Sequence, residues 1–236
     1  MNLPDQRPDP GSLRPVSGGQ QDKQGTDEAL AAVLGGLAYA LLRVFRLSAE
    51  ATGFAPSLAA AERQAAFAVE EHQRFRALRK RLGAVTDDPE AAVARFRPAL
   101  DAFYDATPIN GWLEAQVFHF VGDTITADFA ELFGGVVDER TAAAVREALT
   151  GRGAHEGFAL EQIDRARATQ ADAEDRIVAV ASKIVGEAIN RVRDAMFASD
   201  SLEVVFGGPD AVKDAVLEIL GRHRERLERL GLDRLD

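Results

Sequence analysis

The fold class is indicated first by residues 57–83, SLAAAERQAAFAVEEHQRFRALRKRLG. The stretch follows Pro56 and begins with Ser57, whose hydroxyl suits the N-cap of a helix. It ends at Gly83, and glycine is the residue type most often found just past a helix C-terminus. These start and stop signals predict one long helix across the whole stretch.

Similar signals predict helices along the rest of the chain. No segment shows convincing strand alternation with hairpin turns. The sequence therefore predicts an all-α fold, an antiparallel bundle with short connections. The expected helices cover residues 27–51, capped by Thr26 and ended by Gly53; 88–105, begun by Asp88 and Pro89 and divided by Pro98; 111–133, ended by Gly134 and Gly135; 138–168, weakened by Gly151 and Gly153; 171–198; and a last helix from Pro209 to about Leu230.

The length of 236 residues suits one domain. We expect a disordered tail over residues 1–25, where four prolines and four glycines accompany few apolar residues. We expect the bundle over residues 26–200, and a C-terminal helix within 201–236 that packs on or beside it. The most apolar run, Ala29–Leu42, has 14 uncharged residues, whereas a membrane-spanning helix needs about 20. We therefore expect a buried core helix there and no membrane attachment.

Charge and composition exclude several kinds of site. The formal net charge of −10 disfavours non-specific binding to nucleic acid or to an anionic membrane. The chain has no cysteine, so it has no disulfide, zinc–thiolate site or cysteine nucleophile. No glycine-rich phosphate loop or nucleophile elbow occurs either. The apolar stretch of a secretory signal is missing at the N-terminus, and we expect a cytoplasmic protein.

Six positions on the expected helices stand where a dinuclear iron site in a four-helix bundle would need ligands. Such sites take one glutamate from each of two helices and a Glu-x-x-His pair from each of the other two. Leu41 and Glu71 are 30 residues apart, and Asp123 and Arg152 are 29 apart, which suits two helical hairpins of similar length. The six positions are Leu41, Glu71, Arg74, Asp123, Arg152 and His155.

At these positions the chain resembles the actinobacterial branch of ferritin-like proteins related to the tRNA hydroxylase that oxidises a methylthio-isopentenyl-adenosine base. The resemblance covers roughly residues 28–200, and it implies a ferritin-like antiparallel four-helix bundle with extra C-terminal helices and an ancestral di-iron oxygen chemistry. It also implies that Glu71, Asp123 and His155 are remnants of the metal site. The strings that carry it are LAYALLRVF, FAPSLAAAERQAAFAVEEHQRFRALRKRL, WLEAQVFHFVGDTITADF, AHEGFALEQI and KIVGEAIN.

The other three ligand positions are substituted. Leu41 stands where the resemblance implies a glutamate, Arg74 where it implies a histidine, and Arg152 where it implies an acidic residue. A leucine has no donor atom and an arginine does not lose its proton, so the three remaining ligands cannot hold two cations. We therefore expect no bound metal, and ion pairs Arg74–Glu71 and Arg152–Asp123 in its place. Iron is the alternative cofactor.

Several nearby residues are open to a second interpretation. Glu114 is the rival of Asp123 as the inward-facing acid of its helix. His72 and His119 are candidate substitute ligands, but we expect both to lie off the inward face. His223 belongs to the apolar stripe of the last helix, and we expect a structural role for it.

Two functions are compatible with these residues. The first is a non-catalytic ferritin-like protein with a degenerate di-iron site and a structural or partner-binding role. The alternative is a metal-dependent, oxygen-using hydroxylase that acts on a modified tRNA base. Surplus apolar residues on the last two long helices favour a homodimer. Binding of tRNA is expected only from the family resemblance, since the net charge disfavours nucleic acid.

Overall fold

The computed structural model describes the backbone of residues 18–232, and the side chains of residues 24–194 and 199–232. The described residues form helices joined by short turns and contain no strand, which confirms the all-α fold class. The elements are α1 (Gly18–Ala51), the short 3-10 helix η1 (Thr52–Phe54), α2 (Leu58–Val85), α3 (Pro89–Ala94), α4 (Arg97–Ala106), α5 (Trp112–Val136), α6 (Glu139–Leu149), α7 (Arg152–Thr169), α8 (Ala173–Ala198), α9 (Ser201–Phe206) and α10 (Pro209–Arg229).

Side-chain caps define the starts of three of these helices. The hydroxyl of Ser57 accepts a hydrogen bond of 3.2 Å from the backbone N–H of Ala60, so α2 begins where the sequence predicts. Asp88 caps α3 in the same way, and Asp138 caps α6. Pro98 lies in the first turn of α4, and the expected helix over 88–105 is indeed divided at this point.

Several features differ from those expected. α1 begins at Gly18, upstream of the expected cap Thr26, because extending a helix costs less than starting one. Residues 1–17 of the expected tail lie outside the described residues. α5 continues through Gly134 to Val136, since the missing side chain at Gly134 lets Val145 of α6 pack closely against this turn. The short helix α9 was not expected.

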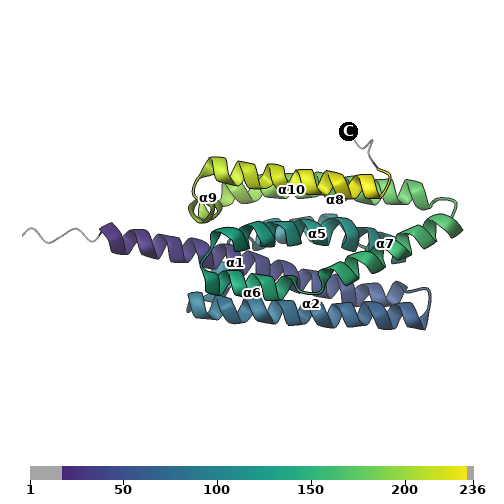
Figure 1. The fold of residues 1–236 in the computed structure, drawn as a ribbon, viewed down its shortest axis with the longest axis horizontal. Coiled ribbons are helices and arrows are strands. Elements are labelled where there is room, and N and C mark those ends of the chain that lie inside the picture. The colour runs from purple at the N-terminus through teal and green to yellow at the C-terminus, as the bar shows by residue number, and fades with distance from the viewer. Residues whose placement is uncertain (1–17, 233–236) are drawn as a thin grey trace, which may run out of the picture.

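The helices form a four-helix bundle with a further layer on one side (Figure 1). α1 and α2 make one antiparallel hairpin, and α5 makes the other with α6 and α7, which together form a fourth helix broken at Gly151. α8 and α10 cover the side of α5 that faces away from α2. α5 is therefore covered on both sides, and 14 of its 25 residues are buried.

The apolar helix α1 packs inside the bundle. Among the described residues, the segment Gln24–Phe54 is the one helical stretch long and apolar enough to cross a membrane, and 67% of its most apolar window is buried in the protein. Leu34 and Val44 are fully buried, and Leu41 packs in a cluster with Leu78 and Leu82 of α2. Length and composition alone are weak evidence for a membrane span, because a buried core helix passes the same test.

Candidate functional site: a polar centre in the bundle

A buried polar centre lies where α2, α5 and α7 meet. On α2, Gln64, Glu71 and Arg74 are spaced by seven and three residues, so they share one face. On α5, Gln116, His119 and Asp123 share a face for the same reason, and α7 adds His155. All seven side chains are at most 5% exposed. Polar groups this deeply buried require partners, and the contacts among them define the site.

Arg74 is bound on three sides. Its Nη1 donates a hydrogen bond of 2.5 Å to Oε1 of Glu71, and its Nη2 donates to Glu70 at 3.1 Å. Nη2 and Nε also donate to the backbone carbonyl of Thr150, at 3.0 and 3.3 Å. Gly151 has φ +80°, and this left-handed turn between α6 and α7 sits directly against the guanidinium group. The expected ion pair between Arg74 and Glu71 is therefore confirmed.

The amide of Gln64 lies between the two histidines. Its Nε2 is 3.3 Å from Nε2 of His119 and 3.5 Å from Nε2 of His155. Its Oε1 accepts a hydrogen bond of 3.1 Å from the amide of Gln116. Since an amide nitrogen only donates, both imidazoles accept through Nε2 and carry their proton on Nδ1. One side-chain NH₂ group therefore occupies the space between the two Nε2 atoms that face each other across the centre.

Asp123 is bound by His119 rather than by Arg152. Nδ1 of His119 donates to Oδ2 of Asp123 at 2.6 Å. Arg152 instead donates through Nη2 to the backbone carbonyl of Asp123, also at 2.6 Å. The expected ion pair between the side chains of Arg152 and Asp123 is therefore wrong: Arg152 bonds the backbone of Asp123 and not its carboxylate. The reason is that His119 lies one turn from Asp123 on α5, so its imidazole is closer to the carboxylate than the guanidinium that α7 supplies.

The expectation that His119 lies off the inward face was also wrong. His119 is 3% exposed and is four residues from Asp123, so the two side chains share a face. That spacing was the signal available in the sequence. Gln64 and Gln116 were missed because glutamine is not a characteristic metal ligand. His72 does lie outward, against the rings of Phe45 and Phe75.

Two of the remaining candidates lie away from the polar centre. Glu114 forms an ion pair of 2.7 Å with Arg176 of α8, so Asp123 rather than Glu114 lines the polar centre. Leu41 is 4% exposed within an apolar cluster and contributes no polar atom. α1 therefore places an apolar side chain where the resemblance implies a metal ligand.

Electrostatics keep Glu71 ionised despite its burial. Burial alone raises the pKa of Glu71, but the neighbouring His155 and the positive charges of Arg152 and Arg74 outweigh it and bring the pKa to about 2. The same burial lowers the pKa of His155, although Glu71 opposes that shift. The positive charges of Arg74 and Arg152 therefore both act on the buried carboxylate of Glu71.

These residues do not fit a dinuclear iron site. Leu41 offers no ligand, and the guanidinium of Arg74 already neutralises and hydrogen-bonds the carboxylate of Glu71. Two added cations would place at least four further positive charges beside Arg74 and Arg152. A buried site cannot stabilise such an excess of charge without additional carboxylates.

A single-cation position is nevertheless present. His119, Asp123 and His155 each offer a ligand atom, and these atoms lie within 4.8 Å of one another. Two histidines and one carboxylate are the donor set of many single-iron oxygenases. One oxygen of Asp123 and one of Glu71 have no hydrogen-bond partner among the described residues. Both carboxylates line a polar cavity of about 220 Å³ that extends to Arg226 of α10.

A comparison with known protein families agrees with the fold. The family model described as "Ferritin-like domain, actinomycetes" matches residues 24–208, which span the bundle, α8 and α9. No curated protein matches the chain.

Proposed function

The chain belongs to the ferritin-like domain family of actinomycetes, and on that basis we propose that it is a non-catalytic binding protein built on a degenerate di-iron bundle. The observation that carries this proposal is the placement of Arg74. Its guanidinium hydrogen-bonds Glu71 and the carbonyl of Thr150, so a fixed positive charge stands where a ligand histidine is implied. The polar centre then acts as an internal ion-pair network that holds α2, α5 and α7 in register.

Charge balance supports a metal-free centre. The guanidinium of Arg74 hydrogen-bonds the carboxylate of Glu71, and the charge of Arg152 also favours its ionised form, so this carboxylate is compensated without any ion. The amide of Gln64 also stands between the two imidazoles, where a cation bound to both Nε2 atoms would have to lie. A metal ion would have to displace this amide and leave its donors unpaired, which costs free energy in a buried site.

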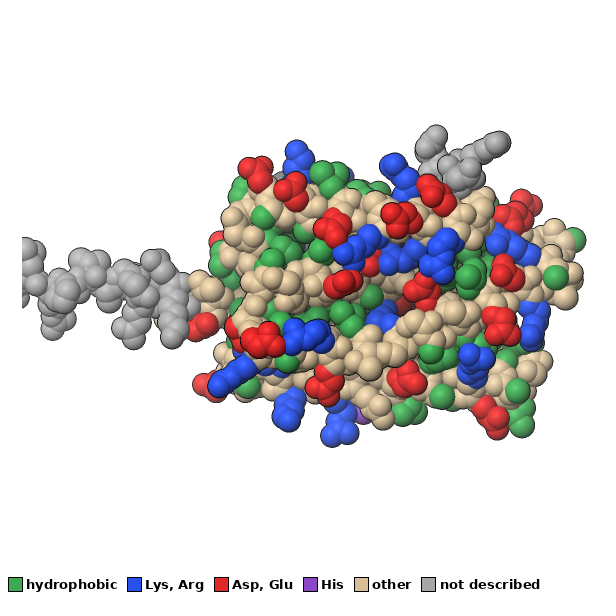
Figure 2. All heavy atoms as spheres, viewed as in Figure 1, with side chains coloured by type: hydrophobic (Ala, Val, Ile, Leu, Met, Phe, Trp, Pro, Cys, Tyr) green, Lys and Arg blue, Asp and Glu red, His purple; other side chains and the backbone are tan. Residues whose placement is uncertain are grey.

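A second candidate function is single-metal chemistry at His119, Asp123 and His155. The unpartnered oxygen of Asp123 favours it, because a bound cation would satisfy this atom. A metal in such a site supplies Lewis-acid or redox chemistry. The action on a modified tRNA base that the resemblance implies remains part of this second candidate. Figure 2 shows that the basic side chains of the visible face have acidic side chains beside them, which weakens the attraction of this face for RNA.

Oxygen consumption separates the two candidates. Purified full-length chain is incubated with Fe²⁺ under limited oxygen, and oxygen uptake is compared with that of Fe²⁺ in buffer alone. We expect no uptake above the buffer rate. The variant His119→Ala is the matched control, because it removes a ligand of the single-metal site and leaves Glu71 and Arg74 in place. Uptake that the parent shows and His119→Ala lacks would support the second candidate and contradict the first.

A further inference from the structure

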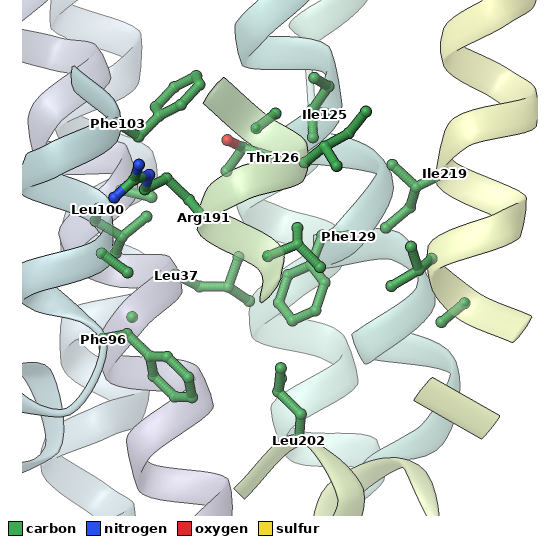
Figure 3. Close-up of a pocket in the computed structure, with 18 of the residues that line it drawn as sticks. Leu37, Phe96, Leu100, Phe103, Ile125, Thr126, Phe129, Arg191, Leu202 and Ile219 are labelled. Atoms are coloured by element: carbon green, nitrogen blue, oxygen red, sulfur yellow. The ribbon is translucent and has the colours of Figure 1, made fainter. Parts of the chain in front are cut away.

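A second cavity, of about 270 Å³, lies between the bundle and the C-terminal helices (Figure 3). Its walls come from α1, α4, α5, α8, α9 and α10, with Leu37, Phe103, Phe129 and Ile219 among the apolar side chains that line it. Protein interiors are normally packed with few voids larger than a water molecule. An engineered apolar cavity of about 150 Å³ stays dry and binds benzene, so a larger one with similar walls is suited to a hydrocarbon ligand.

Part of the cavity lining is exposed on α8 and α10. Ile189 of α8 and Leu220 of α10 both line it, and they are 51% and 38% exposed. These are large apolar side chains that a closed protein would bury. An apolar molecule therefore meets an apolar rim before it enters, and reaches a core wall formed by α1 and α5.

One buried side chain of the wall, His223, has no partner at either of its polar atoms. His223 of α10 is 3% exposed, and neither of its ring nitrogens has a hydrogen-bond partner among the described residues. Burial lowers the pKa of His223, so the ring is neutral and offers one N–H donor and one lone pair. A buried imidazole without partners is costly, and a ligand atom that donates or accepts would satisfy it.

Two other polar groups of the wall, Tyr104 and Arg191, have partners, although Nε of Arg191 has no hydrogen-bond partner among the described residues. The hydroxyl of Tyr104 donates to the carbonyl of Ala40 at 3.2 Å. The guanidinium of Arg191, which Figure 3 shows beside Leu100 and Phe103, forms ion pairs with Glu187 and Asp194. An anionic ligand would therefore find no unpaired positive charge among the described residues of the wall. The lining selects for an uncharged head group.

We propose that this cavity binds a neutral single-chain lipid, with its hydrocarbon chain between α1, α5 and α8 and its head-group oxygen hydrogen-bonded to His223. This inference rests on the proposed binding role and gives it a ligand class. A second copy of the chain is a poorer occupant, because a folded surface reaches the rim at Ile189 and Leu220 but not the buried His223.

The lipid site and the polar centre lie on opposite faces of α5. Ile125 and Phe129 line the apolar cavity, whereas His119 and Asp123 line the polar one. The helix backbone separates the two, so a lipid in the cavity does not approach His119 or His155. Binding of this ligand is accordingly independent of any metal at His119, Asp123 and His155.

Titration calorimetry with 1-dodecanol tests the proposal on the purified full-length chain. We expect saturable binding with about one site. Ala188→Phe places a ring in the cavity from α8 and should abolish binding, whereas Ser182→Phe adds the same ring to an exposed position of α8 outside the cavity and should not. If circular dichroism shows that the Ala188→Phe variant is unfolded, the Ala215→Phe variant, which fills the cavity from α10, takes its place.

A second variant tests the head-group contact. His223→Leu keeps the wall apolar and removes both nitrogens, so binding of 1-dodecanol should weaken roughly tenfold, as the loss of one hydrogen bond implies. Binding of dodecane should not weaken. The proposal would be overturned if the parent did not bind 1-dodecanol, or if the parent and the cavity-filling variant bound it equally. It would also be overturned if light scattering showed a dimer that Ile189→Asp disrupts and no lipid bound. None of these outcomes depends on metal content, so the polar-centre proposal is tested separately.

Discussion

The guanidinium group of Arg74 donates a hydrogen bond of 2.5 Å to the carboxylate of Glu71, one turn away on α2, with both side chains at most 5% exposed. Because neither charge reaches water, each of the two groups needs the other as a hydrogen-bond partner. Arg74 also joins α2 to the turn between α6 and α7, since it donates to the carbonyl of Thr150. Arg74 is therefore a structural residue of the polar centre.

Arg74→Ala should lower the free energy of unfolding by about 3–5 kcal/mol, because it leaves the Glu71 carboxylate buried without its partner. Urea denaturation at pH 7 measures the change. Arg76→Ala, at an exposed position of the same helix, should change stability by no more than about 0.5 kcal/mol. The double variant Glu71→Leu/Arg74→Leu should recover most of the loss. Equal stabilities of Arg74→Ala and Arg76→Ala would show that Arg74 reaches solvent.

Acid should destabilise the fold through Glu71. Its pKa is about 2 in the folded protein and near 4.5 when unfolded, so its stabilising contribution is present above pH 4.5 and is lost as the pH falls toward 2. The shift corresponds to about 3 kcal/mol. The free energy of unfolding of the parent minus that of Glu71→Gln should therefore stay constant from pH 7 to about pH 5 and shrink below it. A difference that is independent of pH down to pH 3 would contradict the assignment, and Glu62→Gln, at an exposed position of α2, is the control.

Gln64→Ala should create metal affinity. The substitution removes the amide that lies 3.3 and 3.5 Å from the Nε2 atoms of His119 and His155, so both lone pairs become free. We expect visible absorption from Co²⁺ bound to the variant and none from the parent. Gln73→Ala, at an exposed position of the same helix, should behave like the parent. Equal Co²⁺ binding by the parent and Gln64→Ala would mean that the amide does not block the site.

Restoring the implied ligands should restore iron binding. In the triple variant Leu41→Glu, Arg74→His and Arg152→Glu, two guanidinium groups are removed and three donors are added. We expect this variant to bind iron and a chelator to lower its melting temperature, because a metal that binds only the folded state adds to stability. The same chelator should not affect the parent. If the chelator left the melting temperature of the triple variant unchanged, these three positions would not converge on one metal site.

The sequence predicted the helices well where short-range chemistry fixes them. Ser57, Asp88 and Asp138 cap helices through their own side chains, and Pro98 divides its segment. The start of α1 and the passage of α5 through Gly134 depend on helix extension and on contact with Val145, which local signals do not contain.

The polar centre was predicted in part. The three-residue spacing of Glu71 and Arg74 determines that they meet, so this pair could be read from the sequence. The position of Gln64 between His119 and His155 depends on how α2, α5 and α7 are packed, and no spacing within one helix determines it. The apolar cavity likewise arises from the placement of α8 and α10 against the bundle.

The metal content of the purified full-length chain tests the central claim most directly. Mass spectrometry of protein prepared without chelators should find well under one equivalent of iron, manganese and zinc together. Two equivalents of iron with an oxo-bridge absorption would contradict the account. One equivalent of metal in the parent that is absent from the His119→Ala variant would also contradict the account. It would assign the metal to the site formed by His119, Asp123 and His155.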